Sequence, residues 1–180
     1  IHLILEIDLP AVENIDYPHV VKLKKLLHAI SQSAPFTPNI SKLSERIGIS
    51  RPALIKALHY LERARLIIQL NKNKKGISAL SKPDKIYINN PAIIMALENQ
   101  NPDPGNIRET FFANQMMDLF RLEIPEKGDF IIENKTVFEI EGKNKTNKQI
   151  KTIPEAYIVQ DNIETGIQHT IPLWLFGFLY

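Results

Sequence analysis

The sequence predicts an α+β fold, and two patterns carry this prediction. In the first hundred residues, apolar side chains recur at the three- and four-residue spacing of helices that bury one face. Further on, the largely apolar runs 128–132 and 137–143 flank a short polar turn, which is typical of a strand hairpin. The polar stretch 99–105 contains two prolines and a glycine and predicts a domain boundary. We therefore expect a helical domain at 20–99 and a mixed-sheet domain with flanking helices at 106–180.

Charge is distributed unevenly along the chain, although the net charge of the 180 residues is only +2. Between residues 20 and 90 there are 14 basic and 3 acidic side chains, whereas acids outnumber bases on either side. A basic block of this density is typical of a surface that binds a polyanion. The helical domain is therefore the predicted site of nucleic-acid binding.

The composition bears on the cellular location of the chain and on whether it has a membrane partner. The chain has no cysteine, which excludes disulfides and cysteine zinc sites and favours a cytoplasmic location. No apolar run reaches the roughly 20 residues that a membrane-spanning helix needs, so we expect no membrane partner. The longest run, 171–180, is interrupted by a proline and a glycine. We interpret it as core that covers the sheet, with Trp174, Phe176 and Phe178 buried.

The helical domain has the pattern of a winged helix. Helices are expected at 20–33, at 41–46 with Ser41 as its cap, and at 50–64, and a Gly-Ile-Ser turn separates the last two. Two predicted strands, 66–70 and 85–88, follow and are joined by a lysine-rich loop. Helix, turn, helix and then a two-stranded wing is the order typical of winged helix-turn-helix domains.

In that arrangement the last helix enters the major groove and the loop meets phosphates, so duplex DNA is the favoured partner. Candidate contacts are the residue that caps the helix, its outer polar residues and the lysines of the loop: Ser50, Arg51, Lys56, His59, Tyr60, Arg63, Lys72, Lys74 and Lys75. Alternatives stay open, because winged helices also dock proteins and lysine-rich turns are often only solvated. A lone helix histidine such as His59 is most often an ordinary surface residue.

Charged residues also gather in the hairpin of the second domain. Side chains alternate across a strand, so Glu139, Glu141 and Lys143 share one face, while the apolar residues between them take the other. Asp129 lies at the mouth of the partner strand. Paired carboxylates with a lysine suit a divalent cation and a water held against a phosphodiester. If this site is active, Asp129 with Glu139 or Glu141 would bind Mg²⁺ and Lys143 would orient the attacking water. The alternative is a salt-bridged patch at the strand ends that carries no catalysis.

The order of Asp129, Glu139 and a nearby lysine resembles the PD-(D/E)XK nuclease-like fold. More closely, four runs resemble the nuclease-like C-terminal domain of unknown function in a family of prokaryotic AAA-type ATP-binding proteins: 107–112 (IRETFF), 128–130 (GDF), 138–145 (FEIEGKNK) and 171–177 (IPLWLFG). The resemblance covers nearly the whole chain, because that family places a winged helix before this domain. It implies that Glu109, on the first helix, and Gln149, after the lysine strand, join the catalytic set.

The resemblance also implies that residues 1–19 are the tail of an ATPase lid. No GxxxxGK[ST] loop occurs here, so ATP would bind the chain's own N-terminal ATPase module, outside this sequence. For Glu109 the alternative is an acid that stabilises a helix N-terminus, and Gln149 fits by position only.

The sequence departs from the nuclease motif at the position of its lysine, and this departure bears on whether the domain can cleave nucleic acid. The nuclease lysine is expected two residues after the second acid, and Glu141 occupies that position relative to Glu139. Counted from Glu141, Lys143 fits, but Asp129 must then reach Glu141. We therefore expect a nucleic-acid-binding fragment of an ATP-binding protein, with a nuclease-like domain that is degenerate or of unproven activity. The alternatives are an active Mg²⁺-dependent nuclease and a protein-docking module that couples the ATPase to a partner.

Overall fold

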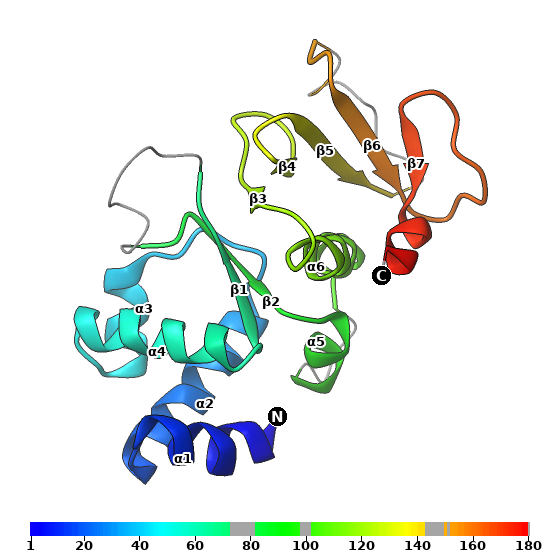
Figure 1. Cartoon of the computed structure of the whole chain (residues 1–180). Coiled ribbons are helices and arrows are strands. Elements are labelled where there is room, and N and C mark those ends of the chain that lie inside the picture. Colours follow the sequence, from blue (N-terminus) through cyan, green and yellow to red (C-terminus); the bar gives the residue numbers. More distant parts are fainter. Residues whose placement is uncertain (73–81, 98–101, 143–149, 151, 180) are drawn as a thin grey trace.

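The computed structural model of the chain describes residues 1–72, 82–97, 102–142, 150 and 152–179. It confirms the predicted α+β class: one half is helical with a two-stranded hairpin, and the other is built on a five-stranded mixed sheet (Figure 1). Within these ranges, no helix is both long enough and apolar enough to cross a membrane.

The helical half contains a π-helical turn η1 (Ile4–Asp8), α1 (Leu9–Glu13), α2 (Tyr17–Ser31), α3 (Ile40–Ile47), α4 (Arg51–Arg63), β1 (Ile67–Leu70), β2 (Lys85–Ile88) and α5 (Pro91–Leu97). Asp16, Asn39 and Ser50 cap α2, α3 and α4, and each side chain accepts the main-chain N–H three residues on. Gly48 ends α3 with φ of 70°, a conformation that favours glycine. The predicted Ser41 cap is wrong, because α3 begins at Ile40 and Asn39 satisfies its first turn.

The β1–β2 hairpin is a wall shared by two hydrophobic cores. The strands pair antiparallel, with Ile67 opposite Ile88. Because side chains alternate across a strand, one set of residues joins the core of the helical half and the other joins the core of the sheet half: Ile67, Ile86 and Ile88 in the first, and Ile68, Leu70 and Tyr87 in the second. The two halves are therefore joined by packing as well as by the chain.

The sheet has the order β3 (Leu122–Glu123), β4 (Phe130–Ile132), β5 (Thr136–Glu141), β6 (Ala156–Gln160) and β7 (Thr170–Pro172). Strands β3 to β5 pair antiparallel, and β5 to β7 pair parallel. Helix α6 (Pro104–Met116) lies between the hairpin and the sheet (Figure 1). Its Phe112 is fully buried, and its ring centroid lies 5.1, 5.2 and 4.9 Å from those of Phe130, Phe138 and Phe176. This aromatic cluster fixes α6 on one face of the sheet.

The chain ends in a 3-10 helix, η3 (Leu173–Phe178). Phe176 is buried as predicted, but Trp174 and Phe178 are exposed, so that part of the prediction is wrong. A 3-10 helix has three residues per turn, which places Leu173 and Phe176 on the same side and leaves Trp174 off it. The indole N–H of Trp174 instead donates to the carbonyl oxygen of Ile163 at 3.2 Å.

Candidate functional site

Helix α4 presents one polar face to solvent. Its apolar stripe is buried in the helical core at Leu54, Leu58 and Leu61. The exposed positions include four of the residues predicted to contact nucleic acid: Arg51, Lys56, His59 and Arg63. Ser50 has a structural task, because its hydroxyl oxygen accepts the N–H of Ala53 at 3.3 Å. Four of the predicted contact residues of the helix are thus exposed, whereas Tyr60 is half-buried against the helical core and Ser50 holds the first turn.

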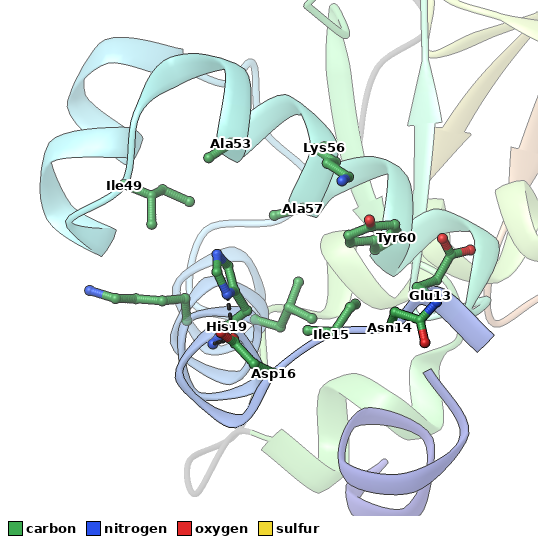
Figure 2. Close-up of a pocket in the computed structure, with 12 residues that line it drawn as sticks. Glu13, Asn14, Ile15, Asp16, His19, Ile49, Ala53, Lys56, Ala57 and Tyr60 are labelled. Carbon is green, nitrogen blue, oxygen red and sulfur yellow. Dashed lines mark hydrogen bonds and ion pairs between the residues drawn. The ribbon is translucent and has the colours of Figure 1, made fainter. Parts of the chain in front are cut away.

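A cavity of about 240 Å³ lies beside α4, walled by the start of α2 and by the turn after α1 (Figure 2). On the α4 side, the Lys56 ammonium lies 5.4 Å from the centroid of the Tyr60 ring. The hydrogen bond with Tyr60 raises the pKa of Lys56, and the charge of Glu13 adds to this effect. Lys56 and Tyr60 therefore form one wall of the cavity. The charge of Lys56 on this wall interacts with that of Glu13 from the N-terminal segment.

The opposite wall of the cavity is set by α2. The Asp16 carboxylate contacts the imidazole Nδ1 of His19 and also accepts the main-chain N–H of His19 at 3.0 Å, and these two contacts lower the pKa of Asp16. One turn later, the Lys22 ammonium donates to the carbonyl oxygens of Ile47 and Gly48 at 3.1 and 3.2 Å. Lys22 thus ties α2 to the turn before α4 and fixes the width of the cavity.

Arg63, at the end of α4, has a partner that the sequence did not indicate. Its guanidinium forms an ion pair with the Glu13 carboxylate at the end of α1. The Glu13 side chain is only 16% exposed, whereas that of Arg63 is 53% exposed. The N-terminal segment therefore holds an acid against the predicted nucleic-acid-binding face.

Of the predicted wing lysines, the structure describes Lys72. Its side chain is exposed, and its main-chain N–H donates to the Asp84 carboxylate at 3.0 Å across the start of the loop. Lys74 and Lys75 lie outside the described residues. Lys72 lies at the end of the hairpin where the predicted wing begins.

In the sheet half, Asp129 and Glu139 are neighbours across two strands. Phe130 pairs with Phe138, and the N–H of Asp129 donates to the carbonyl oxygen of Phe138 at 2.9 Å. One Asp129 carboxylate oxygen accepts the N–H of Ile140 at 2.8 Å. This main-chain contact fixes the Asp129 carboxylate at the mouth of the hairpin, as the sequence predicts.

Glu139 and Glu141 are both buried on β5. Phe138 and Ile140, which alternate with them, lie in the core under α6, so the two glutamates belong to the opposite face of the sheet. Lys143 and Gln149 lie outside the described residues.

Glu109 lies on the other side of the sheet, on α6. Its carboxylate forms an ion pair with Lys85 of β2 at 2.8 Å and lies 3.4 Å from the Tyr87 hydroxyl, which donates to it. Burial raises the pKa of Tyr87 far above its usual value, and the charges of Glu109 and Asp129 add to this shift. The structure thus pairs Glu109 with a hairpin lysine and separates it from Glu139 and Glu141.

The predicted metal ligands do not assemble into a site within the described ranges. Among those residues, no group of three or more histidine, cysteine or acidic side chains is placed to hold a metal ion. The binding of Mg²⁺ by Asp129 with Glu139 or Glu141 stays a prediction.

Comparison with known proteins identifies a family. The family model described as Domain of unknown function (DUF8612) matches residues 1–104, which is more than half of the chain. The chain belongs to the DUF8612 family. No curated protein and no solved structure matches it.

The part matched by the DUF8612 model ends at the first residue of α6. It includes η1, α1, the cavity, the exposed face of α4 and both strands of the hairpin. The carboxylates at 109, 129, 139 and 141 lie beyond it. The DUF8612 region and the sheet half thus carry separate candidate sites.

Three residues with a place in these sites were missed from sequence: Glu13, Lys85 and Tyr87. Alternation along β2 places Lys85 and Tyr87 on one face, but nothing in the sequence pairs them with an acid 22 or 24 positions away. Glu13 and Arg63 are 50 positions apart and were likewise beyond local patterns.

Proposed function

We propose that this DUF8612 chain binds duplex DNA through a winged helix whose recognition helix is α4. The order α2, α3, α4 and then the β1–β2 hairpin is the order expected of that domain. Lys72 begins the loop that would form the wing. This interpretation assigns the predicted wing lysines to the phosphate backbone and α4 to the major groove.

The observation that carries the proposal is the exposed basic face of α4. Arg51 at the N-terminal end, Lys56 in the middle and Arg63 at the end all reach solvent while the opposite stripe is buried. Cations on one helix face neutralise phosphates and release their counterions, which provides affinity that depends on salt. The N-terminal residues of a recognition helix contact base edges in this geometry, so Arg51 is the candidate for base contact.

We further propose that the chain is the C-terminal region of an AAA-type ATP-binding protein of the cytoplasm. The motifs of the sheet half and the order of its two parts support this assignment. In that setting ATP binds a module outside this sequence, and the α4 face delivers the ATPase to nucleic acid.

Charge reversal of Lys56 tests DNA binding. Fluorescence anisotropy with a labelled duplex should show tight binding at about 50 mM salt that weakens steeply towards about 200 mM. Lys56→Glu should weaken binding and make the slope of log K against log salt shallower by about 0.9, the value of one phosphate contact.

Lys127→Glu is the matched control, because Lys127 is an exposed lysine of the sheet half and the charge change is identical. An equal loss in both variants would show that only net charge matters. A wild-type chain that does not bind at low salt would contradict the proposal. Binding to a copurifying protein together with indifference to DNA would favour the docking alternative.

A second candidate concerns the sheet half, which we propose to be nuclease-like with a degenerate site. The adjacency of Asp129 and Glu139 on paired strands supports the resemblance. Glu141 at the expected lysine position and the pairing of Glu109 with Lys85 favour loss of activity. If Mg²⁺ binds, Asp129 and one of the β5 glutamates would hold it, and the ion would stabilise negative charge on a phosphate.

Calorimetric titration with divalent cations distinguishes a degenerate nuclease-like site from an active one. The degenerate form predicts no heat of binding with Mg²⁺ or Mn²⁺ and no cleavage of DNA. Metal binding and metal-dependent cleavage, both abolished by Asp129→Asn, would instead establish an active nuclease.

A further inference from the structure

The N-terminal segment places an acid on α4 by firm packing. Leu5 of η1 and Leu9 of α1 are buried in the helical core. Helix α1 is followed by Asn14, whose φ of 50° turns the chain sharply towards α2. Glu13, the last residue of α1, is thereby held against α4, where its side chain is mostly shielded from solvent.

Glu13 places a carboxylate against a cation that we assign to a phosphate contact. Its carboxylate pairs with Arg63, and its charge also acts on Lys56, about two helical turns of α4 nearer the N-terminus. Residues seven apart on a helix lie on the same face. The contact of Glu13 with Arg63 is the direct one, and Arg63 is a cation that we assign to DNA.

Figure 2 shows the same relation from the cavity. Glu13 and Asn14 lie at one end, next to the Tyr60 ring, and Lys56 lies above Tyr60 on α4. The acidic segment and the basic helix thus line the same cavity. An acid of the chain itself thus lies on a surface that the proposed function assigns to a polyanion.

We propose that Glu13 is an internal competitor of phosphate that withholds Arg63 from nucleic acid. This inference rests on the proposed DNA binding by α4. Neutralising Glu13 frees Arg63 to make one more phosphate contact. The N-terminal segment thereby sets the affinity of the α4 face, and any change that moves Glu13 away from α4 strengthens binding.

A double-mutant cycle between Glu13 and Arg63, read out by binding to a labelled DNA duplex, tests this. Glu13→Gln should tighten binding about two- to fivefold, the range of an exposed ion pair. The slope of log K against log salt should become steeper by about 0.9, the value of one added phosphate contact. Arg63→Gln should have little effect in the wild-type background and should remove the whole gain in the Glu13→Gln background.

Glu6→Gln is the control for net charge. Glu6 belongs to the same N-terminal segment but pairs with Lys24 of α2, so its neutralisation should leave affinity nearly unchanged. Thermal unfolding of each variant checks that the fold is kept. The inference is overturned if Glu13→Gln binds like the wild type, or if Arg63→Gln costs the same in both backgrounds. If neither the wild type nor Glu13→Gln binds duplex at low salt, DNA binding itself fails, which is a different result.

Discussion

The ion pair between Lys85 and Glu109 offers the sharpest test of how the two halves are joined. It links β2 of the helical half to α6 of the sheet half, and its side chains are 23% and 19% exposed. Glu109→Gln keeps the shape of the side chain but leaves the Lys85 ammonium without a charged partner. Fully buried pairs lose about 3–5 kcal/mol when one partner is removed, and exposed pairs lose about 0–1 kcal/mol.

Partial exposure places this pair between those limits, so we expect Glu109→Gln to lower the free energy of unfolding by about 1–3 kcal/mol. With a urea m-value of about 2 kcal/mol per M, the midpoint should fall by about 0.5–1.5 M. Lys85→Met in the Glu109→Gln background should recover part of the loss, because it removes the uncompensated charge.

Asp118→Asn is the matched control. Asp118 pairs with Arg65 at 2.7 Å, also between the two halves, but both side chains are more than half exposed, at 60% and 57%. Its loss should stay below about 1 kcal/mol. Equal losses for Glu109→Gln and Asp118→Asn would refute the reasoning. Because the hairpin is shared by both cores, Trp174 fluorescence and far-UV circular dichroism should also report a single transition in each variant.

Three further predictions concern the core and the hairpins. Phe112→Ala should lower the free energy of unfolding by about 3–5 kcal/mol in urea denaturation, because it empties the centre of the aromatic cluster; a loss below 1 kcal/mol would contradict this packing. Gly128→Ala should destabilise the β4–β5 hairpin, since Gly128 has φ of 93° and an added Cβ would lie 2.7 Å from Val137 Cγ1; an unchanged urea midpoint would contradict it. The raised pKa of Tyr87 means that its contribution to stability is present below its usual value of 10.0 and is lost as pH rises above that value; urea unfolding between about pH 8 and 11 should show a smaller alkaline loss in Tyr87→Phe than in the wild type.

Local sequence patterns predicted the helices and strands better than the contacts that their side chains make. Strands β1 and β2 and the β4–β5 hairpin follow the sequence prediction because apolar runs and turn residues are encoded locally. Asn39 was overlooked as a cap because Ser41, two residues on, is an equally good capping residue type. Trp174 and Phe178 were expected to be buried because an apolar run does not show which of its residues a 3-10 helix turns outward.

The sequence contains a signal that the β1–β2 hairpin is buried on both faces. Leu66 to Ile68 is an uninterrupted apolar run, and strands buried on both faces show such runs rather than alternation. For the candidate sites, sequence indicated which cations of α4 lie on its exposed side and that Glu139 and Glu141 share a strand face, while the roles of these residues stay predictions. It could not show that Glu13 pairs with Arg63 or Lys85 with Glu109, because those contacts depend on how distant elements pack.

Hydrogen–deuterium exchange with and without a DNA duplex tests the central claim most directly, because it locates the bound surface without any substitution. The account predicts that DNA slows exchange in the peptides that cover α4 and the start of the wing, residues 50–72. Peptides covering β4 and β5, residues 128–141, should exchange at the same rate in both states. Protection confined to the sheet half, or no protection anywhere at low salt, would contradict the assignment of DNA binding to α4.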